Sequence, residues 1–129
     1  MVMKTSKKVA VFKVNLENCI MQFLMITKPM HKLTNQEINV LGALLYQYIV
    51  NKNNFKREED LWKYVFDYDT KQKIKDQLDM GNAVFQNTLT SLRKKKVLVD
   101  NKVVALFIPN IENNDEAFEL TFRFIIKNG

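Results

Sequence analysis

The feature that most constrains the fold of this sequence is a helix start at residues 34–37, Thr-Asn-Gln-Glu, directly before an apolar run. In such a capping box the Thr34 hydroxyl accepts a hydrogen bond from the Glu37 amide, and the Glu37 carboxylate accepts one from the Thr34 amide. Apolar residues then recur every three or four positions through Ile49, and polar residues 51–54 follow. The sequence therefore predicts an amphipathic helix of about four turns.

Periodicity predicts the other elements, because apolar spacings of three and four are typical of helices and alternation is typical of strands. Asp69 and Thr70 are expected to cap one of the helices. The predicted elements are a strand at 8–16, a helix at 16–27 ended by Pro29, the capped helix, helices at 57–66, 71–78 and 83–95, a hairpin of 97–99 with 103–106, an acidic loop at 110–116 and a strand at 118–126. With only 3 Gly and 2 Pro, a sandwich with many tight turns is disfavoured.

Length and residue usage exclude several classes of protein. A chain of 129 residues fits one domain, and its single Cys and single His allow neither an internal disulfide nor a structural zinc site. The apolar runs are much shorter than a membrane-spanning helix, and the N-terminal apolar stretch stops at Lys13, too soon for a secretory signal. We therefore expect a soluble cytoplasmic protein without metal, cofactor or membrane contact.

Catalysis is also disfavoured, because it needs a reactive group with a base and an orienting partner nearby. His31 stands just before a helix cap, where a hydrogen-bonded surface imidazole is usual, and Cys19 is typical of a small core residue. Asp67 and Asp69 suit helix capping better than metal binding. We expect a protein that is not an enzyme.

Residues 33–107 predict a helix, a short helix, a turn, a helix and a basic β-hairpin, in that order. The residues of this pattern are Ile74 and Leu78, then Gly81, Asn82 and Ala83, then Phe85, Leu89 and Leu92, and finally the basic run 93–96 before 97–99. The pattern resembles the winged helix-turn-helix family over residues 33–107, although Lys96 stands where such domains usually carry glycine.

The resemblance implies an α+β fold: a winged helix-turn-helix core at 33–107, an N-terminal strand-helix extension at 1–32, and an acidic loop with a C-terminal strand at 108–129. The Lys- and Asn-rich, Gly-poor composition also resembles small proteins of tailed bacteriophages, including crAss-like phages. Phages use winged helices both to bind DNA and as virion parts.

In such a domain, residues 83–95 would form the recognition helix in the major groove of double-stranded DNA. Asn and Gln suit adenine edges, and basic side chains suit phosphates. The expected base-facing residues are Asn82, Gln86, Asn87 and Thr90, and the expected phosphate-binding residues are Arg93, Lys94, Lys95, Lys96 and Lys102. The alternative is that lysines at a helix end interact with the helix dipole and keep the surface soluble.

Two functions remain open for the chain. It is either a small DNA-binding regulator or replication accessory protein, or a structural subunit of a phage virion. Seven acids against six bases at 56–79, and the apolar face of the C-terminal strand, favour a protein partner or a homo-oligomer. The N-terminal arm, with Lys4, Lys7, Lys8 and Lys13, would either track a DNA backbone or be a solvated terminus.

Overall fold

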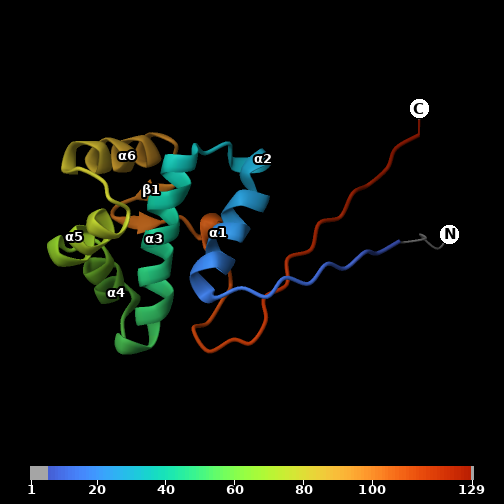
Figure 1. Cartoon of the computed structure of the whole chain (residues 1–129), viewed down its shortest axis with the longest axis horizontal. Coiled ribbons are helices and arrows are strands. Elements are labelled where there is room, and N and C mark those ends of the chain that lie inside the picture. Colours follow the sequence, from blue (N-terminus) through green and yellow to red (C-terminus); the bar gives the residue numbers. More distant parts are fainter. Residues whose placement is uncertain (1–5, 129) are drawn as a thin grey trace.

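Six α-helices and one two-stranded antiparallel hairpin make up the regular structure of residues 6–128, the part of the chain that the computed structural model describes (Figure 1). The helices are α1 (Leu16–Ile26), α2 (Lys28–His31), α3 (Asn35–Asn51), α4 (Glu58–Val65), α5 (Tyr68–Gln77) and α6 (Asn82–Lys94). The strands are β1 (Leu98–Val99) and β2 (Lys102–Val103), and single 3₁₀ turns lie at Lys52–Asn54 and Ala105–Phe107. This mostly helical arrangement is broadly α+β.

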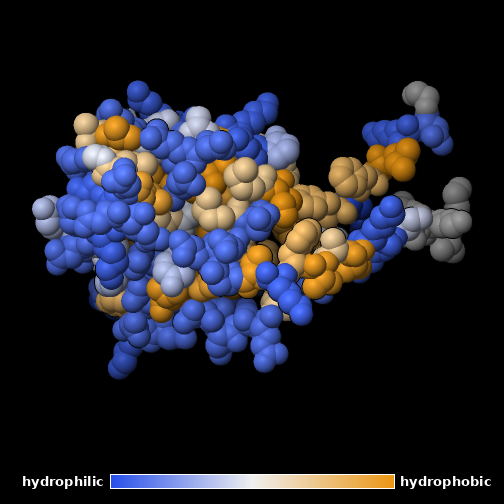
Figure 2. Space-filling model, in the orientation of Figure 1, coloured by the Kyte–Doolittle hydropathy of each residue, from blue (hydrophilic) through white to orange (hydrophobic). Residues whose placement is uncertain are grey.

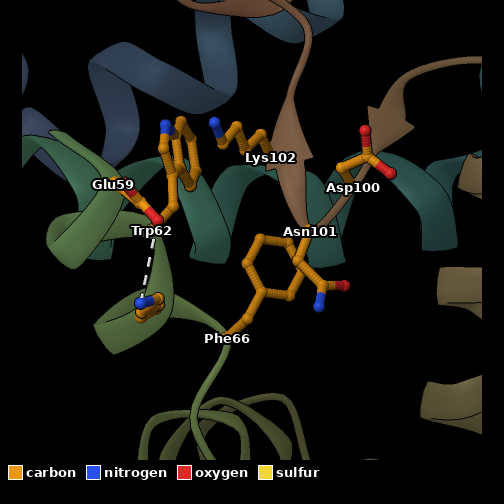
Figure 3. Close-up of a pocket in the computed structure, with 7 residues that line it drawn as sticks. Glu59, Trp62, Phe66, Asp100, Asn101 and Lys102 are labelled. Atoms are coloured by element: carbon orange, nitrogen blue, oxygen red, sulfur yellow. Dashed lines mark ion pairs between the residues drawn. The ribbon is translucent and has the colours of Figure 1, made fainter.

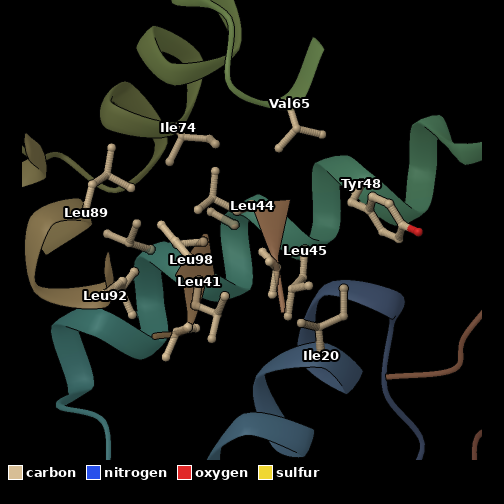
Figure 4. Close-up of a cluster of buried hydrophobic side chains, with 14 of the residues drawn as sticks. Ile20, Leu41, Leu44, Leu45, Tyr48, Val65, Ile74, Leu89, Leu92 and Leu98 are labelled. Carbon is tan, nitrogen blue, oxygen red and sulfur yellow. The ribbon is translucent and has the colours of Figure 1, made fainter. Parts of the chain in front are cut away.

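Helix α3 forms the centre of the molecule, with α1 on one side and α4, α5 and α6 on the other (Figure 1). The predicted capping box is confirmed: Thr34 Oγ1 accepts from the Glu37 amide at 3.1 Å, and Glu37 Oε1 accepts from the Thr34 amide at 2.8 Å. Figure 4 shows the resulting core, in which Leu41, Leu44 and Leu45 of α3 lie among side chains from every other long helix. Burial of these side chains supplies most of the stability of the fold.

Helix α1 confirms the predicted helix at 16–27, with the Asn15 side chain accepting from the Asn18 amide at 2.8 Å. It crosses α3 closely at Gly42, where an added Cβ would lie 2.6 Å from Met21 Sδ. Pro29 ends α1 as predicted, but it also sits in the first turn of the short helix α2. A proline is tolerated there because the first helical amides have no partner within the helix.

Helices α5 and α6 follow one another through a tight turn, as the sequence predicts. The cap of α5 is Asp67, whose side chain accepts from the Thr70 amide at 2.7 Å, so the prediction of a cap at Asp69 and Thr70 was wrong by one half-turn. Asp69 instead lies in the first helical turn, where its charge favours the helix dipole. In α6 the residues Phe85, Leu89 and Leu92 are fully buried, which confirms the predicted inward face.

The predicted hairpin is confirmed, but its strands are shorter than expected. Leu98 pairs with Val103 and Val99 with Lys102, and the two turn residues Asp100 and Asn101 have φ of 53° and 55°. Two left-handed residues define a type I′ turn, whose twist matches that of a hairpin. The expected strand at 103–106 ends early because residues 105–107 close a 3₁₀ turn instead.

The predicted strands at 8–16 and 118–126 were wrong. Residues 6–15 and 117–128 have no regular structure and, within the described chain, residues 6–14 and 116–128 make no backbone hydrogen bond to another segment. Alternation fixes which side chains share a face, but a strand also needs a neighbouring backbone to pair with. Both segments leave the body on the side of α1 (Figure 1) and expose most of their apolar side chains (Figure 2).

Among residues 6–128, no helix has both the length and the apolar character needed to cross a membrane.

Candidate nucleic-acid interface

The outward face of α6 is open to solvent. Asn82, Asn87 and Thr90 are exposed and Gln86 is half-buried, so the four predicted base-facing residues share one accessible surface. Val84 is 43% exposed but lies on another side of α6, where it lines a shallow hollow with Gln36 and Asn39 of α3. The terminal segments leave the molecule on the opposite side from α6 and do not cover this face (Figure 1).

These four polar side chains differ in what they already bind. Lys75 Nζ donates to Asn82 Oδ1 at 3.0 Å, and Thr90 Oγ1 donates to the Gln86 carbonyl at 3.0 Å. Within residues 6–128 the side-chain amides of Gln86 and Asn87 hold no protein hydrogen bond. Both therefore keep all their donors and acceptors for a ligand.

Four basic residues follow at the C-terminal end of α6, and one of them is engaged. Lys95 Nζ donates to Glu37 Oε1 at 2.6 Å, and Ser91 Oγ donates to Glu37 Oε2 at 2.6 Å. In the described part of the chain, Arg93, Lys94 and Lys96 make no ion pair and are exposed. These three residues are therefore the cations best placed to bind phosphate, whereas Lys95 is held in an ion pair with Glu37 that stabilises the fold.

Glu37 is almost completely buried, with 3% of its surface exposed. Burial opposes its ionisation, but hydrogen bonds from Lys95, Ser91 and Thr34 outweigh that cost and lower its pKa to about 2. The carboxylate therefore stays charged and bound at any pH near neutrality. It fixes the end of α6 against the start of α3.

Lys96 occupies the left-handed position that the family resemblance assigns to glycine, with φ of 64°. Its amide donates to the Arg93 carbonyl at 3.1 Å, and the Val97 amide donates to the Leu92 carbonyl at 3.0 Å. This pair of bonds is the Schellman arrangement that ends a helix. The chain thus reaches the hairpin despite the absence of glycine, at the cost of strain in a residue with a Cβ.

Lys102 lies apart from the free cations of α6. It lines a groove of about 360 Å³ between α4 and the hairpin turn, together with Trp62, Lys63 and Phe66. Figure 3 shows Glu59 and Asp100 at the same groove, so positive and negative side chains are mixed there. The hairpin tip therefore offers a weaker phosphate site than the end of α6.

His31 is hydrogen-bonded as expected, whereas Cys19, expected as a core residue, is only half-buried at the edge of the core. The Leu33 amide donates to His31 Nδ1 at 3.0 Å, and His31 Nε2 lies 2.9 Å from the Leu24 carbonyl oxygen. Burial raises the pKa of the half-buried Cys19 thiol. Within residues 6–128 no three metal-ligating side chains gather into a site. In the N-terminal arm, Lys7, Lys8 and Lys13 are exposed, whereas Lys4 lies outside the described residues.

Sequence reasoning missed the cluster of Glu37, Ser91 and Lys95. These residues are 54 and 58 positions apart, and the capping box explains Glu37 without any partner. It also missed Lys75, whose contact with Asn82 crosses the turn between α5 and α6. Comparison of the chain with protein-family models, curated proteins and solved structures finds no match.

Proposed function

We propose that this chain binds double-stranded DNA through α6, as a winged helix-turn-helix protein that carries out no reaction. In this proposal it is a small regulator or replication accessory protein of a bacteriophage. α3, α5 and α6 would form the three-helix core, and the hairpin β1–β2 would be the wing.

One observation carries the proposal: the uncovered polar face of α6 ends in uncompensated positive charge. Gln86 and Asn87 present unengaged amides, Arg93 and Lys94 follow on the same helix, and Lys96 lies directly beyond its end. Bidentate amides distinguish adenine in the major groove, and basic side chains bind the flanking phosphates. The two kinds of group stand in the order that a helix lying in the groove requires.

The charges also set how strongly salt should weaken binding. Because Glu37 binds Lys95 and Lys102 lies beside α4, three cations at the C-terminal end of α6 remain for phosphates: Arg93, Lys94 and Lys96. Each neutralised phosphate contributes about −0.9 to the slope of log affinity against log salt, so three predict a slope of about −3.

A fluorescence anisotropy titration of labelled duplex DNA at two salt concentrations tests this proposal. We expect saturable binding at micromolar protein that weakens about eightfold when the salt concentration doubles, since the slope is about −3. Absence of salt-dependent binding would contradict DNA recognition.

The exposed apolar side chains of the C-terminal segment favour a second candidate, a subunit of a phage virion. Phe124 and Ile126 are each 85% exposed. Several large apolar side chains exposed side by side are typical of a surface that binds another protein. Mass spectrometry of purified particles tests this candidate, because a virion part must be present in stoichiometric amounts.

A further inference from the structure

The C-terminal segment 117–128 carries the alternation of a strand but has no strand beside it in the described chain. Its even-numbered residues through Ile126 are apolar, and its odd-numbered residues are mostly polar. The exposed fractions rise from 39% at Leu120 and 44% at Phe122 to 85% at Phe124. Figure 2 shows apolar side chains along the extended C-terminal segment beyond the main body of the molecule. Both the backbone and one apolar face of this segment are therefore available to a partner.

We propose that residues 117–125 pair antiparallel with the same segment of a second copy of this chain, around a two-fold axis at Thr121. Identical segments that pair in this way form a self-complementary interface. The inference concerns a surface remote from α6 and does not depend on DNA binding.

Charge complementarity selects this register. Centred on Thr121, it sets Glu119 of each copy opposite Arg123 of the other and Thr121 opposite Thr121, and both are favourable cross-strand pairs. On the other face it sets Leu120 opposite Phe122 and Phe118 opposite Phe124.

Neighbouring registers lose these pairs. Centring on residue 119 or 123 places two carboxylates or two guanidinium groups opposite each other, which is unfavourable. Centring on Phe122 places Glu119 opposite Ile125 and leaves no directly opposed ion pair. Centring on Arg123 also sets Glu119 opposite Lys127, but the two guanidinium groups then face each other. The register at Thr121 pairs Glu119 with Arg123 and opposes no like charges, while every apolar residue of 118–124 lies against another.

The N-terminal arm is a poorer partner for this segment. Residues 6–15 carry Lys7, Lys8 and Lys13 and no acid, while residues 117–128 carry two bases and one acid. Both segments therefore carry a net positive charge, and the arm has no carboxylate to pair with Arg123. Two copies of the C-terminal segment can instead pair Glu119 of one with Arg123 of the other.

Phe118 shows where the apolar face of the paired segments would rest. Its ring packs edge-on against Phe23 of α1, with centroids 6.1 Å apart and planes at 75°. The apolar, even-numbered face of the segment therefore begins in contact with α1 of its own copy. In the dimer, the helices of each copy would cover one end of the two-stranded ribbon.

Sedimentation velocity of the full chain over a range of concentrations tests the proposal by charge exchange. We expect a monomer–dimer equilibrium for the wild type. Arg123→Glu and Glu119→Arg should each raise the dimer dissociation constant about tenfold, because each opposes like charges at two symmetric positions. The double variant carrying both substitutions should restore the wild-type constant.

Lys13→Glu is the matched control, since it reverses an exposed charge outside the paired segment. It should leave the dimer constant unchanged. A wild type that stays monomeric at millimolar concentration, a double variant that is no better than the single ones, or dissociation caused by Lys13→Glu would each overturn the proposal.

Disulfide trapping tests the register separately. Thr121→Cys should give a cross-linked dimer on mild oxidation, because directly opposed residues lie about 4.5–5.5 Å apart at Cα. Ile125→Cys is the control, since its two copies would lie eight residue steps apart, roughly 27 Å. Wild type, with Cys19 alone, reports background oxidation. Equal cross-linking of both variants would overturn the register.

Discussion

Lys95 at the end of α6 donates to Glu37 in the first turn of α3 across 2.6 Å. Glu37 also accepts from the Thr34 amide as a member of the capping box, so one buried carboxylate both starts α3 and holds α6. The direction in which α6 presents its outward face is therefore coupled to the start of the central helix.

The Glu37 cluster predicts an acid-sensitive contribution to stability. The folded pKa of about 2 lies below the ordinary 4.5, so the carboxylate stabilises the fold above about pH 5, and this contribution is lost as the pH falls toward 2. The shift corresponds to at most about 3 kcal/mol. Urea unfolding of wild type and Glu37→Gln should show a difference of roughly 2–3 kcal/mol at pH 7 that nearly vanishes near pH 2. A difference independent of pH would contradict the assigned role.

Lys96 predicts a stabilising substitution. Because its φ of 64° strains a residue with a Cβ, Lys96→Gly should raise the free energy of unfolding by about 1 kcal/mol. Lys94→Gly removes the same charge from the last helical residue of α6 and should instead lower stability, by up to about 1 kcal/mol. Thermal unfolding of both variants measures these two changes in stability. Melting temperatures that shift in the same direction in both variants would contradict the left-handed backbone at Lys96.

The C-terminal segment predicts a sharp boundary between dispensable and required residues. A chain ending at Phe118 should keep its unfolding free energy within about 0.5 kcal/mol at concentrations where it is monomeric, because the residues beyond are exposed. A chain ending at Asn110 loses Ile111, which is 4% exposed, and the ion pair of Lys52 with Glu112 at 2.9 Å. It should lose roughly 2–3 kcal/mol. Equal stability of both chains would show that Ile111 is not part of the core.

The sequence allowed the helices to be predicted because their signals are local. The Thr34 and Glu37 cap, the period of Phe85, Leu89 and Leu92, and the turn at Asp100 and Asn101 each lie within one element. The terminal strands failed for the opposite reason. Strand formation depends on a partner backbone, and alternation in residues 118–126 says nothing about whether one is present.

The part of the candidate site that depends on local signals was predictable from the sequence, and the part that depends on distant contacts was not. Which residues face outward on α6 follows from helical periodicity, so Asn87 and Arg93 could be found from sequence. That Lys95 differs from its neighbours depends on a contact with Glu37, 58 positions away. The position of Lys102 beside Trp62 depends likewise on packing between distant segments.

Sequence preference, if it arises from α6, should depend on the two unengaged amides. Asn87→Ala and Gln86→Ala should each reduce discrimination between a selected duplex and a random one by about 1–3 kcal/mol. Thr90→Ala is the matched control, because the Thr90 hydroxyl is already bonded to the Gln86 carbonyl. Competition titrations measure the ratio of the affinities for the selected and the random duplex. A larger effect of Thr90→Ala would contradict the assignment of sequence preference to Gln86 and Asn87.

The most direct test of the account compares duplex DNA binding by wild type, by the double variant Arg93→Ala with Lys94→Ala, and by a control with Lys71→Ala and Lys73→Ala on α5. Both double variants lose two positive charges, so any difference in their DNA affinity reflects where the lost charges lie and not the change in net charge. The α6 variant should bind at least about tenfold more weakly and reduce the salt slope by about 2, while the control stays close to wild type. Equal loss in both variants, or no loss in the α6 variant, would contradict the proposal that α6 is the DNA-binding surface.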